Sequence, residues 1–123
     1  MTAVLDAPVD VALAPLTWVD VCGFDELVAD RGACALVGGH QVAIFRVSPR
    51  DELFAVSNHD PFSQANVMSR GIVGSKGDVP KVTSPMYKHA FDLRSGRSLE
   101  DPAVALTVYV VRRNGKRVEV ALP

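Results

Sequence analysis

Short β-type runs, separated by turn residues, occupy the middle of the chain. Residues 33–37, 41–47 and 53–56 are rich in Val, Ile, Leu, Phe and Ala, with a Gly-Gly pair at 38–39 and Ser-Pro-Arg-Asp at 48–51 between them. Runs of this length bounded by Gly, Pro, Ser and Asp are typical of strands. The spacing therefore predicts a three-stranded meander.

An alternating pattern also begins the predicted domain. Side chains at 17–21 change sides with a period of two, which indicates a first strand, and a short helical turn is expected to follow at 24–28. Residues 1–15 have neither a helical nor a strand period. We therefore expect a flexible tail at 1–15 and one domain at 16–123.

The end of the chain carries a hairpin signal. Apolar runs at 104–112 and 116–121 flank Asn114-Gly115, the dipeptide that best accepts positive φ at both central positions of a type I′ turn. The pattern predicts a terminal β-hairpin. Its tip holds the basic residues Arg112, Arg113, Lys116 and Arg117. Charges there keep strand ends soluble and block edge pairing, and a binding role for them is the alternative.

Two segments, 57–76 and 83–96, lack strand patterning and hold most of the Pro, His and Met residues. Irregular segments of this kind are where function is expected. The Gly-rich stretch at 71–77 misses the spacing of a phosphate-binding loop, and we interpret it as a flexible connector. No helical period is long enough for a bundle or a βαβ unit, so the predicted class is all-β.

Composition excludes several functions. The 13 basic and 14 acidic residues give a net charge of -1, which provides no field to attract nucleic acid or anionic lipid. No apolar stretch approaches the about 20 residues that span a bilayer. The N-terminus lacks the basic region of a secretory signal, so we expect a cytoplasmic protein. Cys22 and Cys34 are interpreted as reduced, small apolar fillers.

Neither the histidines nor the candidate nucleophiles predict a catalytic or metal site. His40, His59 and His89 come from distant segments without the close pairing of zinc ligands. Asp60 could be a general base, but Asp before Pro favours a turn whose carboxylate accepts backbone N–H groups. Ser84 lacks the Gly-x-Ser-x-Gly context of a nucleophile elbow. We therefore predict no catalytic residue and no metal site.

Two motifs in the irregular segments resemble the loops of a Rieske domain. The first reads Asn-His-Asp-Pro-Phe at 58–62, followed by Ser-Arg-Gly-Ile-Val at 69–73. The second reads Val-Thr-Ser-Pro-Met-Tyr at 82–87, followed by Phe-Asp-Leu-Arg-Ser-Gly at 91–96. A Rieske [2Fe–2S] domain carries Cys-x-His in one loop and Cys-x-x-His in the other. The resemblance implies a Rieske-like antiparallel β-sandwich with two loops at the vacated cluster end.

All four ligand positions have changed. Asp60 and Phe62 stand at the Cys and His places of the first loop, and Ser84 and Tyr87 at those of the second. Iron–sulfur clusters are held by soft thiolates, for which these side chains are no substitute. We therefore expect no cluster, and we expect the rings of Phe62 and Tyr87 to fill the space between the loops.

This ligand-free variant, over residues 16–122, resembles the small subunit of assimilatory NAD(P)H-dependent nitrite reductase. The resemblance implies a small, cofactor-free subunit with a structural or regulatory role and no independent catalysis. Its partner would be a large subunit that carries FAD, an iron–sulfur cluster and siroheme and reduces nitrite to ammonium. Two alternatives are a Rieske-type electron carrier with an unorthodox cluster and a free-standing Rieske-like interaction domain.

The loops also hold candidate partner contacts. His59, Met86, Lys88 and His89 combine apolar and polar character, the composition expected of a protein interface. The alternative is that Met86 to His89 simply closes the core, with Tyr87 pointing inward and Lys88 toward solvent.

Overall fold

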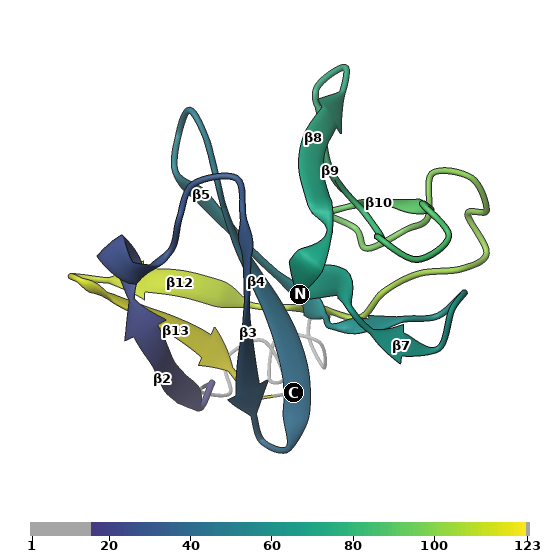
Figure 1. Cartoon of the computed structure of the whole chain (residues 1–123). Helices are drawn as coiled ribbons and strands as arrows, with labels where there is room; N and C mark the ends of the chain where they lie inside the picture. Colours follow the sequence, from purple (N-terminus) through teal and green to yellow (C-terminus); the bar gives the residue numbers. More distant parts are fainter. Residues whose placement is uncertain (1–15, 123) are drawn as a thin grey trace, which may run out of the picture.

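The structure is a computed structural model that describes residues 16–122, so the predicted tail at 1–15 lies outside it (Figure 1). Within the described range the chain forms short antiparallel strands and two single-turn 3₁₀ helices, η1 (Phe24–Glu26) and η2 (Met68–Arg70), which confirms the predicted all-β class. No helix in this range has the length and apolar character needed to cross a membrane. The strands are β2 (Trp18–Gly23), β3 (Gly32–Val37), β4 (His40–Val47), β5 (Glu52–Ser57), β6 (His59–Asp60), β7 (Ala65–Asn66), β8 (Ile72–Lys76), β9 (Val79–Thr83), β10 (Ala90–Asp92), β11 (Val108–Tyr109), β12 (Val111–Asn114) and β13 (Arg117–Ala121).

A four-stranded sheet in the order β11-β5-β4-β3 lies at the centre of the fold. Alternate residues of a strand point to opposite faces, and β4 is buried on both. Val42 and Ile44 join one core cluster, whereas Ala43 and Phe45 join the other. This double burial explains why β4 reads as an almost continuous apolar run.

The central sheet separates two cores (Figure 1). On one side it packs against the sheet β12-β13-β2, with Val118 and Val120 of β13 buried between them. On the other side lies the sheet β10-β9-β8, and Val82, Phe91 and Met68 fill the second core. Both irregular sequence segments belong to this second side of the molecule.

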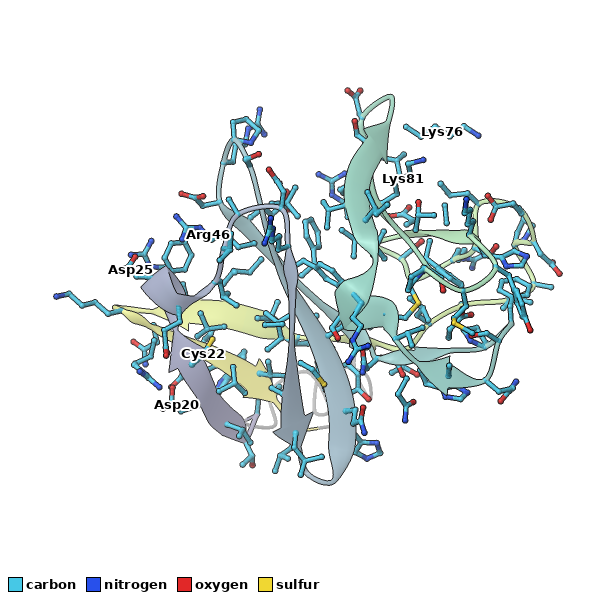
Figure 2. All side chains as sticks on the ribbon, viewed as in Figure 1. Asp20, Cys22, Asp25, Arg46, Lys76 and Lys81 are labelled. Atoms are coloured by element: carbon cyan, nitrogen blue, oxygen red, sulfur yellow. The ribbon has the colours of Figure 1, made fainter. Side chains whose placement is uncertain are left out.

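The predicted meander is confirmed. Strands β3, β4 and β5 pair in sequence order, and opposing Val37 and His40 leave a two-residue turn. Gly38 and Gly39 both have positive φ in that turn, as a type I′ hairpin requires. The predicted helical turn is the 3₁₀ helix η1. Arg46 fixes η1 to the central sheet by donating to the Leu27 carbonyl oxygen at 3.1 Å (Figure 2).

The terminal hairpin is confirmed, but its turn and its first strand differ from the prediction. Asn114 pairs with Arg117, so the turn is centred on Gly115 and Lys116. Only Gly115 has positive φ, the pattern of a type II′ turn rather than type I′. The single strand predicted at 104–112 is instead divided, because β11 pairs with β5 of the central sheet and β12 with β13.

The interpretation of residues 71–77 as a flexible connector is wrong. Most of this stretch is β8, which pairs with β9 from Ile72 opposite Thr83 to Lys76 opposite Val79. Gly77 has positive φ at the turn between them. A mostly exposed strand that contains a glycine gives too weak an apolar alternation to be recognised from sequence.

Most of the basic residues at the terminal hairpin have internal partners. Arg112 pairs with Glu119 at 2.7 Å. Arg117 donates from Nε to Oδ1 of Asp20 and from Nη2 to Oδ2, each at 2.9 Å. The guanidinium of Arg113 lies 3.8 Å from the ring centre of Phe24. These contacts support the structural interpretation of the cluster over a binding role.

The two cysteines differ. Both are free thiols, and Cys22 is half-buried beside the first core. Cys34 is exposed on β3, so its interpretation as an apolar filler is wrong. Cys34 lies on β3, the edge strand of the central sheet, and does not belong to the second core cluster.

Candidate functional site

Two loops meet at one end of the second core. The first leaves β5, forms the small β6–β7 hairpin and ends in η2, and the second connects β9 to β10. Asn58 anchors the first loop: its Oδ1 accepts the Ser69 N–H at 2.7 Å and its Nδ2 donates to the Asn66 carbonyl at 3.1 Å. Asn58 is buried, and its role was missed although it lies in the motif at 58–62. An Asn beside a turn was the available signal.

Asp60 connects the loops through hydrogen bonds. It is fully buried, and its carboxylate accepts the Ser84 hydroxyl at 2.6 Å, the Ser63 hydroxyl at 2.9 Å and the Phe62 backbone N–H at 2.9 Å. Burial raises the pKa of Asp60, but the hydrogen bonds from Ser84, Phe62 and Ser63 together outweigh it and hold the pKa below its usual value. Asp60 is therefore an ionised acceptor within a turn, and nothing in its surroundings gives it access to a substrate.

Aromatic rings fill the space beside this hydrogen bond. The Phe62 ring stacks on the His89 ring with centroids 3.7 Å apart and an interplanar angle of 11°. Phe62 also contacts Phe91 in a tilted arrangement at 5.9 Å. Phe62 fills the space as expected, but the ring that stacks on it belongs to His89 and not to Tyr87.

Tyr87 does not point inward as expected, because its side chain is 63% exposed. Lys88 has a positive φ of 61°, the left-handed conformation that few residues other than glycine adopt. In an extended segment residues 87 and 89 would face the same side, and this backbone reversal at Lys88 breaks the alternation. Tyr87 therefore turns to solvent while His89 turns inward.

The donor set does not fit a [2Fe–2S] cluster. The two inner positions hold the carboxylate of Asp60 and the hydroxyl of Ser84, which are bonded to each other. The outer positions hold Phe62, whose ring has no lone pair to donate, and Tyr87, which faces away. A Rieske cluster requires two thiolates and two imidazoles at these places. Within residues 16–122, no three or more His, Cys, Asp or Glu side chains are grouped as metal ligands.

The predicted partner-contact residues divide into exposed and enclosed ones. Met86 is 48% exposed, and Lys88 is also exposed. His59 is exposed, but its ring nitrogens lie 3.1 Å from the side-chain oxygens of Asn66 and Gln64 in its own hairpin. His89 is enclosed by its stack on Phe62, and its Nδ1 is buried without a hydrogen-bond partner. His40, the third histidine, lies apart from the loops beside Tyr109.

Fold and loops together define a Rieske-like β domain whose ligand positions carry other side chains. The sequence model of the Rieske-like [2Fe-2S] domain family matches residues 17–121. A Mycobacterium tuberculosis protein described as an NADH-dependent nitrite reductase small subunit superposes with a TM-score of 0.85 at 43% identity, over 89% of this chain and 98% of that one. The nitrite reductase (NADH) small subunit of Escherichia coli K12 is 40% identical over 95 residues, which are 77% of this chain and 88% of that protein.

The chain belongs to the nitrite reductase small-subunit family, as the two loop motifs predicted. A further relative has a different architecture. The nitrite reductase [NAD(P)H] large subunit of Klebsiella oxytoca is 38% identical over 106 residues, which are 85% of this chain but 11% of that protein. A domain of this kind is therefore part of the large-subunit polypeptide in that organism.

Proposed function

We propose that this chain is the small subunit of an NAD(P)H-dependent nitrite reductase and acts by binding the large subunit that reduces nitrite to ammonium. The observation that carries the proposal is the identity of 40% to a protein named as that subunit, over 88% of its length. The Klebsiella oxytoca relative supports the same partner. Domains that are fused in one organism and separate in another commonly work in one assembly.

We further propose that the chain contributes no electron-transfer group of its own. Asp60 and Ser84 are hydrogen-bonded to each other, and neither Phe62 nor Tyr87 offers a ligand atom that suits iron. The redox groups implied by the resemblance, FAD, an iron–sulfur cluster and siroheme, would then all belong to the large subunit. This division assigns the small subunit a structural or regulatory role.

The exposed tip of the second loop is our proposed contact with the large subunit. Residues 85–88 present Met86, Tyr87 and Lys88 to solvent as an apolar and basic patch, and His59 of the first loop is also exposed. Aromatic residues and methionine are enriched at interface cores, and a lysine at the rim favours an acidic partner surface. His89, which is half-buried against Phe62, completes the proposed set of contact residues.

Two further proposals concern the chain as a whole. Residues 16–123 form the domain that binds the large subunit, and the segment at 1–15 is dispensable for binding. The subunit works in the cytoplasm, which agrees with the free thiols of Cys22 and Cys34.

The proposal is tested by co-purifying the full chain with the large subunit and measuring nitrite-dependent NAD(P)H oxidation by the complex. Wild type should bind, and Lys88→Glu should weaken binding about tenfold, the effect of losing roughly 1.4 kcal/mol at an interface. Lys116→Glu, the same charge reversal at the terminal hairpin, is the matched control and should bind normally. Failure of wild type to bind would refute the subunit role. Stoichiometric iron and sulfide in the isolated chain would favour an electron carrier.

A further inference from the structure

We propose that Asp60, Ser84, Phe62 and His89 form a metal-free clamp that joins the two loops where a Rieske domain uses its cluster. The clamp has a polar half, the Asp60–Ser84 hydrogen bond, and an aromatic half, the Phe62–His89 stack. It holds residues 85–88 in the shape that the partner recognises. This last step rests on the proposed function, whereas the clamp itself does not.

The polar half lies at the two inner ligand positions. Both side chains are buried, at 0% exposure for Asp60 and 1% for Ser84, and the residues are 24 positions apart in the sequence. A short hydrogen bond to an ionised carboxylate in a dry environment is among the strongest that neutral hydroxyls make. It therefore replaces, with a single contact, the cross-link that two thiolates on one iron would provide.

The polar half also reaches the tip directly. The Ser84 hydroxyl that donates to Asp60 accepts the backbone N–H of Met86 at 3.3 Å, and the Ser84 N–H donates to the His89 carbonyl at 2.9 Å. Ser84 thus closes the second loop on itself while binding the first. Removing its hydroxyl would release the Met86 amide as well as the contact with Asp60.

The aromatic half lies at the outer positions and uses a residue outside the ligand set. His89 reaches Phe62 because Lys88 adopts the left-handed conformation and reverses the side-chain alternation. Two costs accompany this arrangement, a non-glycine residue at positive φ and a buried Nδ1 without a partner. Strained positions persist only where the surrounding contacts stabilise them, so the stack on Phe62 must offset both the positive φ of Lys88 and the unpaired Nδ1 of His89.

Strand pairing joins the loops where the first ends and the second begins, because Ile72 of β8 lies opposite Thr83 of β9, but it does not extend to the β6–β7 hairpin. The β6–β7 hairpin of the first loop is a sheet by itself, and β9 and β10, which flank the second loop, belong to another sheet. Among the described residues no ladder connects these two sheets. Side-chain contacts must therefore hold the β6–β7 part of the first loop against the second loop.

The test measures hydrogen exchange of the full chain, and its affinity for the large subunit, in Ser84→Ala and Phe62→Leu. Both variants should raise the exchange rates of the amides at residues 84 and 86, which are hydrogen-bonded within the second loop, by about tenfold or more, the signature of local opening, and weaken partner binding about tenfold. Ser98→Ala is the matched control, because Ser98 is also buried and its hydroxyl also accepts backbone N–H groups, from Glu100 and Asp101, in the segment that follows β10. It should leave tip exchange and binding unchanged.

Unchanged exchange at residues 84 and 86 in both variants would overturn the clamp. Faster exchange with undiminished binding would overturn its role in recognition. If wild type itself fails to bind the large subunit, the proposed function is wrong, and the exchange data still decide whether the clamp exists. Phe62→Leu keeps the test decisive if Ser84→Ala does not fold.

Discussion

Gly32→Ala should destabilise the domain strongly although it adds only one methyl group. Gly32 begins β3 and lies directly against η2, which ends the first loop. A Cβ built at this position would collide with the Ser69 carbonyl oxygen and lie 2.7 Å from Cε1 of Phe45. Phe45 is fully buried, and the Ser69 atom that the Cβ would meet is a backbone oxygen, so neither can move away easily.

The magnitude follows from overpacking. Forcing a methyl group into a well-packed site costs about 1–3 kcal/mol, and a collision with backbone lies at the upper end, about 2–3 kcal/mol. With an m value of about 1.5 kcal/mol per molar for a domain of this size, the urea midpoint should fall by about 1.5 M. Part of the strain should reach the first loop, because the Ser69 N–H is bonded to Asn58, which is followed by His59 and Asp60.

Gly74→Ala is the matched control in urea unfolding followed by circular dichroism. Gly74 is also a strand glycine, and a Cβ there would meet only the Lys81 side chain at an ordinary 3.6 Å. Its midpoint should stay within about 0.3 M of wild type, since surface substitutions typically change stability by less than 0.5 kcal/mol. If the two variants unfold at the same urea concentration, β3 and η2 are not in close contact at Gly32.

Three further predictions concern the two thiols, the carboxylate of Asp60 and the response of the chain to iron and sulfide. Cys34 should react with a thiol reagent faster than Cys22 in the native protein, because burial and then Glu26 raise the pKa of Cys22; equal rates would contradict the exposure difference. The stabilising effect of the lowered pKa of Asp60 is complete above about pH 3.9, its unfolded-state pKa, and is lost as pH falls through the lower folded value. Asp60→Asn should therefore be less stable than wild type by a constant amount from pH 5 to 8, with the difference shrinking below pH 4, and a pH-independent difference down to pH 3 would refute this linkage. Anaerobic reconstitution with iron and sulfide should leave the chain without a stoichiometric cluster, and the visible absorbance of such a cluster would refute the donor-set argument.

The sequence predicted the parts of the fold that local rules determine. The meander follows from apolar runs and a Gly-Gly turn, and both lie where expected. The terminal turn did not follow, because tertiary register decides it. Opposing Val111 with Val120 and Arg112 with Glu119 forces the turn onto Gly115 and Lys116, although Asn114-Gly115 is the better local turn signal.

The candidate site was predictable in position but not in arrangement. The loop motifs identified the four ligand positions, and the expectation from Asp60, Phe62, Ser84 and Tyr87 that no cluster binds stays a prediction. The orientation of Tyr87 was wrong, because no local rule predicts a left-handed lysine at 88. Such a conformation is stable only through contacts formed in the folded state, here the stack of His89 on Phe62.

A Rieske-like domain without a cluster would face two separate physical problems, and Asp60, Ser84 and Phe62 at the ligand positions, together with His89, address them differently. Interiors do not tolerate a void larger than a water, and two loops without a shared ligand lose their cross-link. The rings of Phe62 and His89 address the first problem by filling volume, and the bond between Asp60 and Ser84 addresses the second by joining buried groups. A buried carboxylate at the first inner position needs hydrogen-bond donors, and Ser84 at the second supplies one of them beside Ser63 and the Phe62 N–H. The two inner side chains therefore make sense as a pair, since each is the hydrogen-bond partner of the other.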